Sequence, residues 1–382
     1  MNKILILGGT GIIGAHVCRC ALENGFHVCC LSRRGKLSIE HENLEIIKGD
    51  ISNLEALKET LHELVFDAVI DLLSFDAEQL RKTVDFFQNR MSQYFVVSSA
   101  TIHKSATSEL ITENTERITE GWNYPLEKIR MEEVLVAIAE GQDWTYTIIR
   151  PYITYSEQRL PAAEFELPEI CERIENGCPL PIGNEILNTV TTVTHASDLA
   201  KGIIGLVGNS RAINTAFNIT SDDSHTWKEI IDEIGKNLGK TPIYTSVKIN
   251  DVRELFPILS GKINDRMQTR CFDTQKIKQA IPGFSCDYDL AKGFKEAFPK
   301  NIPCSNLLSQ VILDRLVLKI DKRAYKPAIT AYRKKLWKRE GLKSRLNYVI
   351  YFVPALYKIL RAIKHSLYWA GSTKPSSTNP YV

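Results

Sequence analysis

Tyr124 and Lys128 have the types and the spacing of an acid–base pair. They lie four residues apart in a segment with a helical pattern, so one helix face presents both side chains. An ammonium group beside a phenol stabilises the phenolate and brings its pKa, about 10 when unperturbed, closer to neutrality. A hydroxyl-rich run, Ser98-Ser99-Ala100-Thr101, ends an apolar segment earlier in the chain. A phenol, an ammonium and a hydroxyl can together move a proton at an alcohol or carbonyl oxygen.

The same spacing occurs three times, so its place in the chain decides its meaning. Tyr244/Lys248 and Tyr288/Lys292 repeat it in the later part of the sequence, where a surface or core tyrosine is the simplest interpretation. Tyr124/Lys128 alone follows the fifth of six strand candidates and precedes the sixth. We therefore expect the acid–base pair at Tyr124 and Lys128.

A glycine-rich turn near the N-terminus indicates a cofactor for this chemistry. Its glycines follow the apolar run Ile4–Leu7, and a helical pattern begins at once. Glycines at this spacing allow a sharp turn off a strand, a close approach to a pyrophosphate and tight packing of the helix. The helix N-terminus adds free N–H groups and a positive dipole end. A turn without a ligand is the alternative. The residues expected to bind a dinucleotide here are Gly8, Thr10, Gly11, Ile12, Ile13 and Gly14.

Six apolar strand candidates alternate with helical patterns over the first 150 residues. The strand candidates are Ile4–Leu7, His27–Leu31, Leu44–Ile47, Ala68–Leu72, Tyr94–Val97 and Thr145–Ile149. The helical patterns cover about residues 12–24, 53–64, 76–90 and 124–140. Apolar strands separated by amphipathic helices indicate a parallel sheet covered on both faces. The predicted fold is α/β, a Rossmann-type doubly wound parallel sheet, whose ligands bind beyond the carboxyl ends of the strands.

The segments after the strands bear on the choice of dinucleotide. Ser32-Arg33-Arg34 ends the second strand, where an acidic residue suits the 2′-hydroxyl of NAD and arginines suit the 2′-phosphate of NADP. NADP is therefore slightly favoured over NAD, with solvated loop arginines as the alternative. Asp50, followed by Ile51, is expected either to accept a hydrogen bond from the adenine amine or to be a loop or capping residue before the next helix. Leu73, after the fourth strand, completes the expected cofactor contacts.

The sequence resembles the extended short-chain dehydrogenase/reductase family, the epimerases, dehydratases and reductases that modify sugar nucleotides. The matching pieces are Gly8-x-x-Gly11-x-x-Gly14, Asp50, Ser98-Ser99-Ala100-Thr101, Tyr124-x-x-x-Lys128, Ile149-Arg150-Pro151, Thr194–Ala200 and Phe217-Asn218-Ile219. The resemblance covers about residues 1–300. It implies an NAD(P)-binding domain over 1–155, to which 189–215 returns, and a smaller α/β substrate lobe mainly over 156–304. Phe217-Asn218-Ile219 and a helix from Thr226 are expected in that lobe.

The resemblance also implies roles for individual residues. Tyr124 is the acid/base, Lys128 lowers its pKa and holds the nicotinamide ribose, and Ser99 is the catalytic hydroxyl with Thr101 as its substitute. Arg266 belongs to a region that can approach the nucleotide diphosphate, with a solvated loop as the alternative. The implied substrate is a nucleotide-activated sugar, and a homodimer is expected through 76–90 and 124–140. Nine cysteines without metal-ligand spacing favour the reducing cytoplasm, and no metal site is predicted.

Two departures from the family pattern bear on the reaction. The end of the fourth strand reads Asp71-Leu72-Leu73-Ser74 instead of the usual small residues, which leaves the role of this segment open. Ala100-Thr101-Ile102 follows Ser99 where 4,6-dehydratases carry the Asp-Glu pair that eliminates water. The sequence thus favours an epimerase or a ketoreductase. The alternatives are a reductase of a non-sugar ketone and a non-catalytic NAD(P)-binding scaffold or sensor.

The C-terminal part differs from the rest in charge. Residues 314–365 hold fifteen Lys/Arg against three Asp/Glu, although the whole chain has a formal net charge of only +3. Leu307–Ile320 is predicted to form an amphipathic helix, and 348–370 combines aromatic, apolar and basic residues. Residues 305–382 are therefore predicted to be a basic helical tail with a disordered end. Such a tail fits a peripheral contact with a membrane or a protein, and nucleic acid is disfavoured because no recognised binding module is present.

Overall fold

The chain divides into two compact units, and a computed structural model describes residues 3–61, 63–105, 109–256, 259–305 and 307–339. Unit 1 comprises Met1–Pro161, Val190–His225 and Gln268–Ala297. Unit 2 comprises Ala162–Thr189, Thr226–Met267 and Phe298–Val382. Residues 268–297, which the sequence-based boundaries assign to the substrate lobe, thus lie in unit 1. Residues 348–370, for which the sequence predicts an apolar and basic segment, and the predicted disordered end lie outside the described residues.

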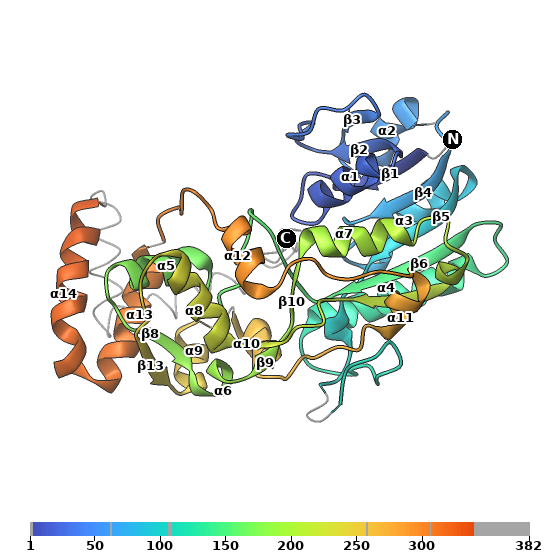
Figure 1. The fold of residues 1–382 in the computed structure, drawn as a ribbon. Coiled ribbons are helices and arrows are strands. Elements are labelled where there is room, and N and C mark those ends of the chain that lie inside the picture. Colours follow the sequence, from blue (N-terminus) through green and yellow to red (C-terminus); the bar gives the residue numbers. More distant parts are fainter. Residues whose placement is uncertain (1–2, 62, 106–108, 257–258, 306, 340–382) are drawn as a thin grey trace, which may run out of the picture. The chain divides into compact units, whose positions relative to one another are not determined.

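A seven-stranded sheet forms the centre of unit 1, in the order β11-β6-β5-β4-β1-β2-β3 (Figure 1). Its strands are β1 (Lys3–Leu7), β2 (His27–Ser32), β3 (Leu44–Lys48), β4 (Phe66–Asp71), β5 (Met91–Val97), β6 (Thr145–Pro151) and β11 (Thr215–Ile219). Neighbouring strands all run parallel; Ile4 of β1, for example, lies between Val28 and Ala68. The prediction of a Rossmann-type doubly wound sheet is confirmed.

Helices cover both faces of this sheet, because alternate side chains of the strands enter two separate cores. Ile4 packs with α1, α7 and α11 on one face, and Leu5 packs with α2, α3 and α4 on the other. The helices of unit 1 are α1 (Gly14–Glu23), α2 (Leu54–Leu61), α3 (Ala77–Phe87), α4 (Asn123–Ala139), α7 (Ala196–Gly205), α11 (Gln275–Ala280) and α12 (Leu290–Ala297). Its short elements are η1 (Gln88–Arg90), η2 (Ala100–Ile102), β7 (Ile153–Tyr155), β9 (Val190–Thr191), β10 (Val193–His195) and η3 (Ser210–Ala212), and β12 (His225–Thr226) follows at the unit boundary.

The strand order reverses beside β1, and this reversal brings the functional loops together. The chain runs outward from β1 to β2 and β3, then returns to β4 on the other side of β1 and continues to β5. The carboxyl ends of β1, β4 and β5 are therefore neighbours. Doubly wound sheets bind ligands at this point of reversal.

The sequence-based placement of Phe217-Asn218-Ile219 in the substrate lobe is wrong. These residues end β11, which pairs with β6 in unit 1, with Phe217 opposite Ile149. All three are buried, as expected of a strand covered on both faces. Three residues after a long connection carry too little periodicity to reveal which sheet they join.

Unit 2 combines helices with one short pair of parallel strands. Its elements are α5 (Leu167–Glu175), β8 (Leu180–Gly183), α6 (Asn184–Leu187), α8 (Trp227–Asn237), β13 (Tyr244–Val247), α9 (Ile249–Leu255), α10 (Ser260–Arg266), α13 (Leu307–Ile320) and α14 (Lys322–Arg339). β8 pairs with β13, and Thr226 and Glu229 close the capping box that starts α8. α13, the helix predicted over 307–320, packs on β8, β13, α9 and α14. No helix in the described ranges is long and apolar enough to cross a membrane.

Candidate functional site

The glycine-rich turn has the geometry that a dinucleotide requires. Gly8 has a φ of +91°, which side-chain-bearing residues rarely adopt, and its N–H donates to the carbonyl of Leu31 at 2.9 Å. A Cβ on Gly14 would lie 2.3 Å from the carbonyl oxygen of Gly8, so only glycine lets α1 pack this closely on the turn. A Cβ on Gly11 would meet that oxygen at 3.6 Å, an ordinary contact, which leaves the space beside Gly11 open.

The N-terminus of α1 follows directly on the glycine-rich turn. Ile13 at the N-cap supplies no side-chain acceptor, and the first turn of α1, which is fully described, contains no acidic residue. Unsatisfied N–H groups and the positive end of the helix dipole therefore point beyond the end of β1. A diphosphate fits these features. The residues that would hold it are Gly8, Thr10, Gly11, Ile12, Ile13 and Gly14.

The segments after β2 and β3 form turns that local hydrogen bonds hold in shape. Ser32 is buried and its Oγ accepts from the N–H of Gly35 at 3.1 Å, which shapes the turn that exposes Arg33 and Arg34. Asp50 Oδ1 accepts from the N–H and the hydroxyl of Ser52, and these bonds hold the pKa of Asp50 below its usual value. The side chain that bonds in the first turn of α2 belongs to Asn53, so Asp50 does not cap that helix, and its bonds to Ser52 are those of a loop residue.

Lys128 is the buried cation of the site, only 2% exposed. Its Nζ donates to the carbonyl of Ser74 at 2.8 Å and to the carbonyl of Val97, at the end of β5, at 3.0 Å. The ring of Phe75 lies 4.7 Å from Nζ. Loss of hydration lowers the pKa of Lys128 to about 8. The lysine is thus fixed between the ends of β4 and β5. With a pKa of about 8, it loses its charge as the pH rises only slightly above neutral.

Asp71, at the end of β4, organises the turn that receives Lys128. Its Oδ1 accepts from the N–H groups of Leu73 and Ser74 at 2.8 and 3.0 Å, and its Oδ2 accepts from the hydroxyls of Ser74 and Tyr94. Burial and this carboxylate raise the pKa of Tyr94 well above its usual value. The departure at Asp71–Ser74 therefore has a structural role. Sequence reasoning missed it, although a carboxylate closing a buried strand was the available signal.

Tyr124 and Ser99 lie on elements that pack together. Tyr124 is half-buried in the first turn of α4, one turn before Lys128, and its ring lies 5.1 Å from that of Trp122. Ser99 is the N-cap of η2, against which α4 packs. Its Oγ accepts from the N–H of Thr101 at 3.3 Å and shares a 2.9 Å hydrogen bond with the Thr101 hydroxyl. A half-buried phenol, a buried ammonium and paired hydroxyls thus occur at one end of the sheet.

In the other two Tyr-x-x-x-Lys spacings the two residues do not share a helix, although Lys292 Nζ lies 4.7 Å from the ring centroid of Tyr288. Tyr244 lies on β13 and donates to Asp232 at 2.7 Å, while Lys248 is the N-cap of α9. Tyr288 precedes α12 and stacks on His195, with ring centroids 3.9 Å apart. Among the three pairs, all described, Tyr124/Lys128 is the one whose members share a helix.

Leu73 and Arg266, predicted to contact the cofactor and the nucleotide diphosphate, contact other protein groups in the structure. Leu73 packs against Gly8, since its Cδ2 lies 2.8 Å from where a Cβ of that glycine would be. Arg266 lies in unit 2, where its guanidinium is 5.0 Å from the Trp227 ring centroid and pairs with Asp265. It is therefore held by its neighbours and is not the solvated loop arginine of the alternative interpretation.

Comparison with known proteins identifies the class. The model of the NAD dependent epimerase/dehydratase family matches residues 4–220, and the chain belongs to this family. The match includes the glycine turn, the Asp71 turn and the Tyr124/Lys128 helix. Membership establishes an NAD-dependent epimerase or oxidoreductase class, in agreement with the resemblance found in the sequence.

Individual relatives are distant. The chloroplast stem-loop binding protein of 41 kDa b from Arabidopsis thaliana is 25% identical over 318 residues, which are 78% of each chain. The UDP-glucose 4-epimerase of Klebsiella pneumoniae is 30% identical over 109 residues, 26% of this chain and 78% of that protein. UDP-glucuronic acid 4-epimerase from Bacillus cereus, solved in complex with NAD, has a TM-score of 0.61 and 18% identity and covers 77% of this chain and 95% of its own. At that identity the structural likeness shows the fold alone.

Proposed function

We propose that this protein is an NAD(P)-dependent epimerase or ketoreductase acting on a nucleotide-activated sugar. The observation that carries the proposal is the buried ammonium of Lys128, held by the carbonyls of Ser74 and Val97 one helical turn from Tyr124. A buried lysine is costly unless its charge is used or neutralised. A phenol that must lose its proton during a reaction is a use for that charge.

Tyr124 is the proposed acid/base. Its phenolate takes the proton of a sugar hydroxyl as the C–O bond becomes a carbonyl, and its phenol returns the proton in the reverse direction. Lys128 stabilises the phenolate by its positive charge. Ser99, with Thr101 beside it, holds the substrate oxygen. The dinucleotide, when bound, takes up or supplies the hydride at the adjacent carbon.

The cofactor is proposed to be NADP or NAD, with NADP slightly favoured. The exposed Arg33 and Arg34 after β2 support the phosphorylated form, because a guanidinium pairs with a 2′-phosphate. Asp50 is proposed to face the adenine and Ile51 and Leu73 to line the cofactor. The NAD in the complex of the Bacillus cereus enzyme supports the other choice.

A nucleotide sugar is the proposed substrate because the epimerases compared above act on UDP-glucose and UDP-glucuronic acid, as their names state. Arg266 is the proposed, weaker contact to its diphosphate. The missing Asp-Glu pair after Ser99 speaks against dehydration. The expected homodimer through residues 76–90 and 124–140 stays a prediction, as does the cytoplasmic location.

A second candidate is a non-catalytic NAD(P)-binding protein. It is favoured by the Arabidopsis relative, which matches far more of this chain than the Klebsiella epimerase does and whose name describes stem-loop binding. Against it stands the complete set of Ser99, Tyr124 and Lys128, which binding alone does not need.

Purification and cofactor extraction followed by a substrate panel distinguish the two candidates. The extracted nucleotide identifies NAD or NADP, and UDP-, GDP- and dTDP-sugars are then tested for epimerisation and for reduction of their keto forms. We expect turnover of at least one sugar nucleotide. Cofactor binding with no turnover of any of them, together with tight binding of an RNA stem-loop, would support the second candidate and contradict the first.

A further inference from the structure

A single helix of unit 2 concentrates positive charge on an exposed face. α14 contains eight Lys/Arg and no Asp/Glu in its 18 residues. Its inner side is apolar: Ile329, Tyr332 and Leu336 are buried, and Tyr332 and Leu336 pack with Cys178 and Val311. The cations therefore lie on an amphipathic helix. Packing of its apolar side against unit 2 sets their positions.

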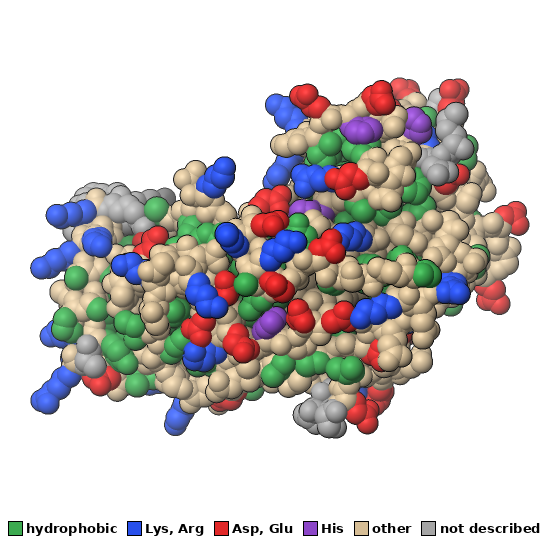
Figure 2. Space-filling model, in the orientation of Figure 1, with side chains coloured by type: hydrophobic (Ala, Val, Ile, Leu, Met, Phe, Trp, Pro, Cys, Tyr) green, Lys and Arg blue, Asp and Glu red, His purple; other side chains and the backbone are tan. Residues whose placement is uncertain are grey.

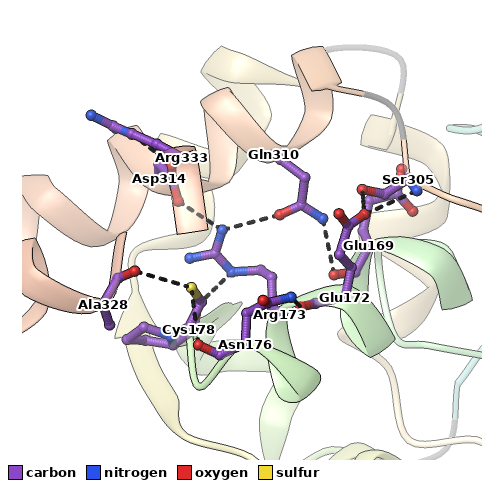
Figure 3. Close-up of polar contacts among 11 residues, drawn as sticks. Glu169, Glu172, Arg173, Asn176, Cys178, Ser305, Gln310, Asp314, Ala328 and Arg333 are labelled. Atoms are coloured by element: carbon purple, nitrogen blue, oxygen red, sulfur yellow. Dashed lines mark hydrogen bonds and ion pairs between the residues drawn. The ribbon is translucent and has the colours of Figure 1, made fainter. Parts of the chain in front are cut away.

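Buried polar contacts fix α14 on the rest of unit 2. Arg173 of α5 and Asp314 of α13 form a fully buried ion pair, with Nη1 donating to Oδ1 at 2.9 Å (Figure 3). Arg333 of α14 donates from Nε to the other oxygen of Asp314 at 2.9 Å. Gln310 accepts from Arg173 at 3.2 Å. One carboxylate thus joins three helices, and Arg333 is the α14 cation used for this purpose.

Several further cations of α14 are exposed. Lys326, Lys334 and Lys338 are exposed, and in the described part of the chain no carboxylate forms an ion pair with any of them. Lys322 and Arg323 extend the same row toward the start of the helix. Figure 2 shows blue side chains along the edge of the molecule where Figure 1 draws α14, with few red ones among them. From Lys322 to Lys338 the row spans about 24 Å of helix.

We propose that this basic face, defined by Lys322, Arg323, Lys326, Lys334 and Lys338, docks on a surface of anionic phospholipid. A helix that lies flat on a membrane brings all cations of one face to the headgroups at once. The centre of the face, Pro327, Thr330 and Ala331, consists of small exposed side chains, which do not hold the cations away from a plane.

The composition of this face distinguishes lipid from nucleic acid. Single-stranded nucleic acids are bound by aromatic side chains on which bases stack, and the centre of the face carries none. The proposal is independent of the function proposed for unit 1.

Co-sedimentation of the full-length protein with vesicles tests the proposal. Vesicles of phosphatidylcholine are compared with vesicles in which one third of the lipid is phosphatidylserine, at low and at high salt. We expect binding to the anionic vesicles, weakened by salt, and none to the neutral ones. Each lysine near the surface contributes about a fivefold gain in affinity, so the triple variant Lys326→Gln/Lys334→Gln/Lys338→Gln is expected to bind about 100-fold more weakly.

The matched control removes three lysines elsewhere in unit 2. Lys240, Lys248 and Lys300 are exposed, and their replacement by Gln changes the net charge equally without touching α14. This control is expected to bind anionic vesicles as the wild type does, and both triple variants should unfold at the same temperature. No binding of the wild type to anionic vesicles, equal losses in both variants, or retention by RNA but not by vesicles would overturn the proposal.

Discussion

At the scale of single residues, Lys128 and Asp71 show how the ends of two strands hold a buried cation in place. Lys128 is enclosed by protein and satisfied by two main-chain carbonyls at the ends of β4 and β5. Asp71 does not contact Nζ, but it holds the turn that supplies one of those carbonyls. Its charge also raises the pKa of Lys128 against the larger effect of burial. The two residues are therefore coupled through geometry and through charge.

We predict that Asp71→Asn moves the alkaline limb of activity to lower pH. Without the carboxylate, burial of Lys128 is opposed less, its pKa falls further below about 8, and the cation is lost earlier as the pH rises. The variant also leaves hydroxyl donors unsatisfied, which costs about 1–3 kcal/mol of stability. The measurement is the pH profile of kcat. Tyr94→Phe is the control, since it removes one hydrogen bond but keeps the charge, and an unchanged limb in Asp71→Asn would disprove the coupling.

The contribution of Lys128 to the free energy of unfolding depends on pH. Its pKa is about 8 in the folded protein and about 10.4 in an unfolded chain. Below the lower value both states are protonated. Between the two values the unfolded chain binds more protons, so the free energy of unfolding rises with pH. We predict that the free energy of unfolding of the wild type, minus that of Lys128→Met, rises by about 3 kcal/mol as the pH increases across this range.

Urea unfolding of both proteins at a series of pH values measures this difference. The variant loses its hydrogen bonds to the two carbonyls at every pH, which adds a constant offset, so only the slope carries the prediction. A stability difference that does not change from pH 8 upward would show that Lys128 is not buried as described.

At the scale of residues, the sequence predicts motifs within one short segment better than it predicts contacts between segments that are far apart in the chain. The Tyr/Lys pair and the glycine turn depend on local geometry, which neighbouring residues determine. The Asp71 turn depends on Tyr94 from the next strand and on Lys128 from a distant helix. Asp198 is a similar case, because it accepts from the N–H groups of Asp287 and Tyr288, which lie 89 and 90 residues later in the chain. Contacts of this kind become visible only when the fold brings the segments together.

At the scale of elements, β1, the glycine-rich turn and α1 pack closely together, and the glycines of the turn differ in what surrounds them. Gly14 faces the turn itself, and Gly11 faces open space. Substitution of the two should therefore affect different properties.

We predict that Gly14→Ala destabilises the fold, whereas Gly11→Ala leaves stability nearly unchanged but weakens dinucleotide binding. A Cβ at position 14 would overlap the carbonyl oxygen of Gly8 at 2.3 Å, and overpacking of this kind costs about 1–3 kcal/mol. A Cβ at position 11 meets only an ordinary 3.6 Å contact but enters the space where we propose that the diphosphate binds. Thermal unfolding and NAD(P) titration of both variants are the measurements. Equal stability of both, or equal affinity of Gly11→Ala and wild type, would contradict the assignment.

At the scale of the whole molecule, the two units differ in how well the sequence predicts them. Unit 1 repeats long apolar strands and amphipathic helices, so its sheet could be predicted almost strand by strand. Unit 2 contains two four-residue strands, β8 and β13, separated by more than fifty residues of chain, and such short segments carry no clear period. The buried Arg173–Asp314 pair likewise joins distant parts of the sequence, so the helix over 307–320 could be predicted but its packing into unit 2 could not.

The central claim is that Tyr124 transfers the proton in a hydride-transfer reaction. The most direct test is the rate of reduction of the bound nicotinamide by a sugar nucleotide that the protein turns over, measured for the wild type, Tyr124→Phe and Tyr288→Phe. Loss of a positioned acid/base is expected to slow the reaction about 100-fold or more in Tyr124→Phe. Tyr288→Phe, which removes a hydroxyl at the same spacing from a lysine, should keep the wild-type rate. A Tyr124→Phe protein that retains the full rate would contradict the mechanism.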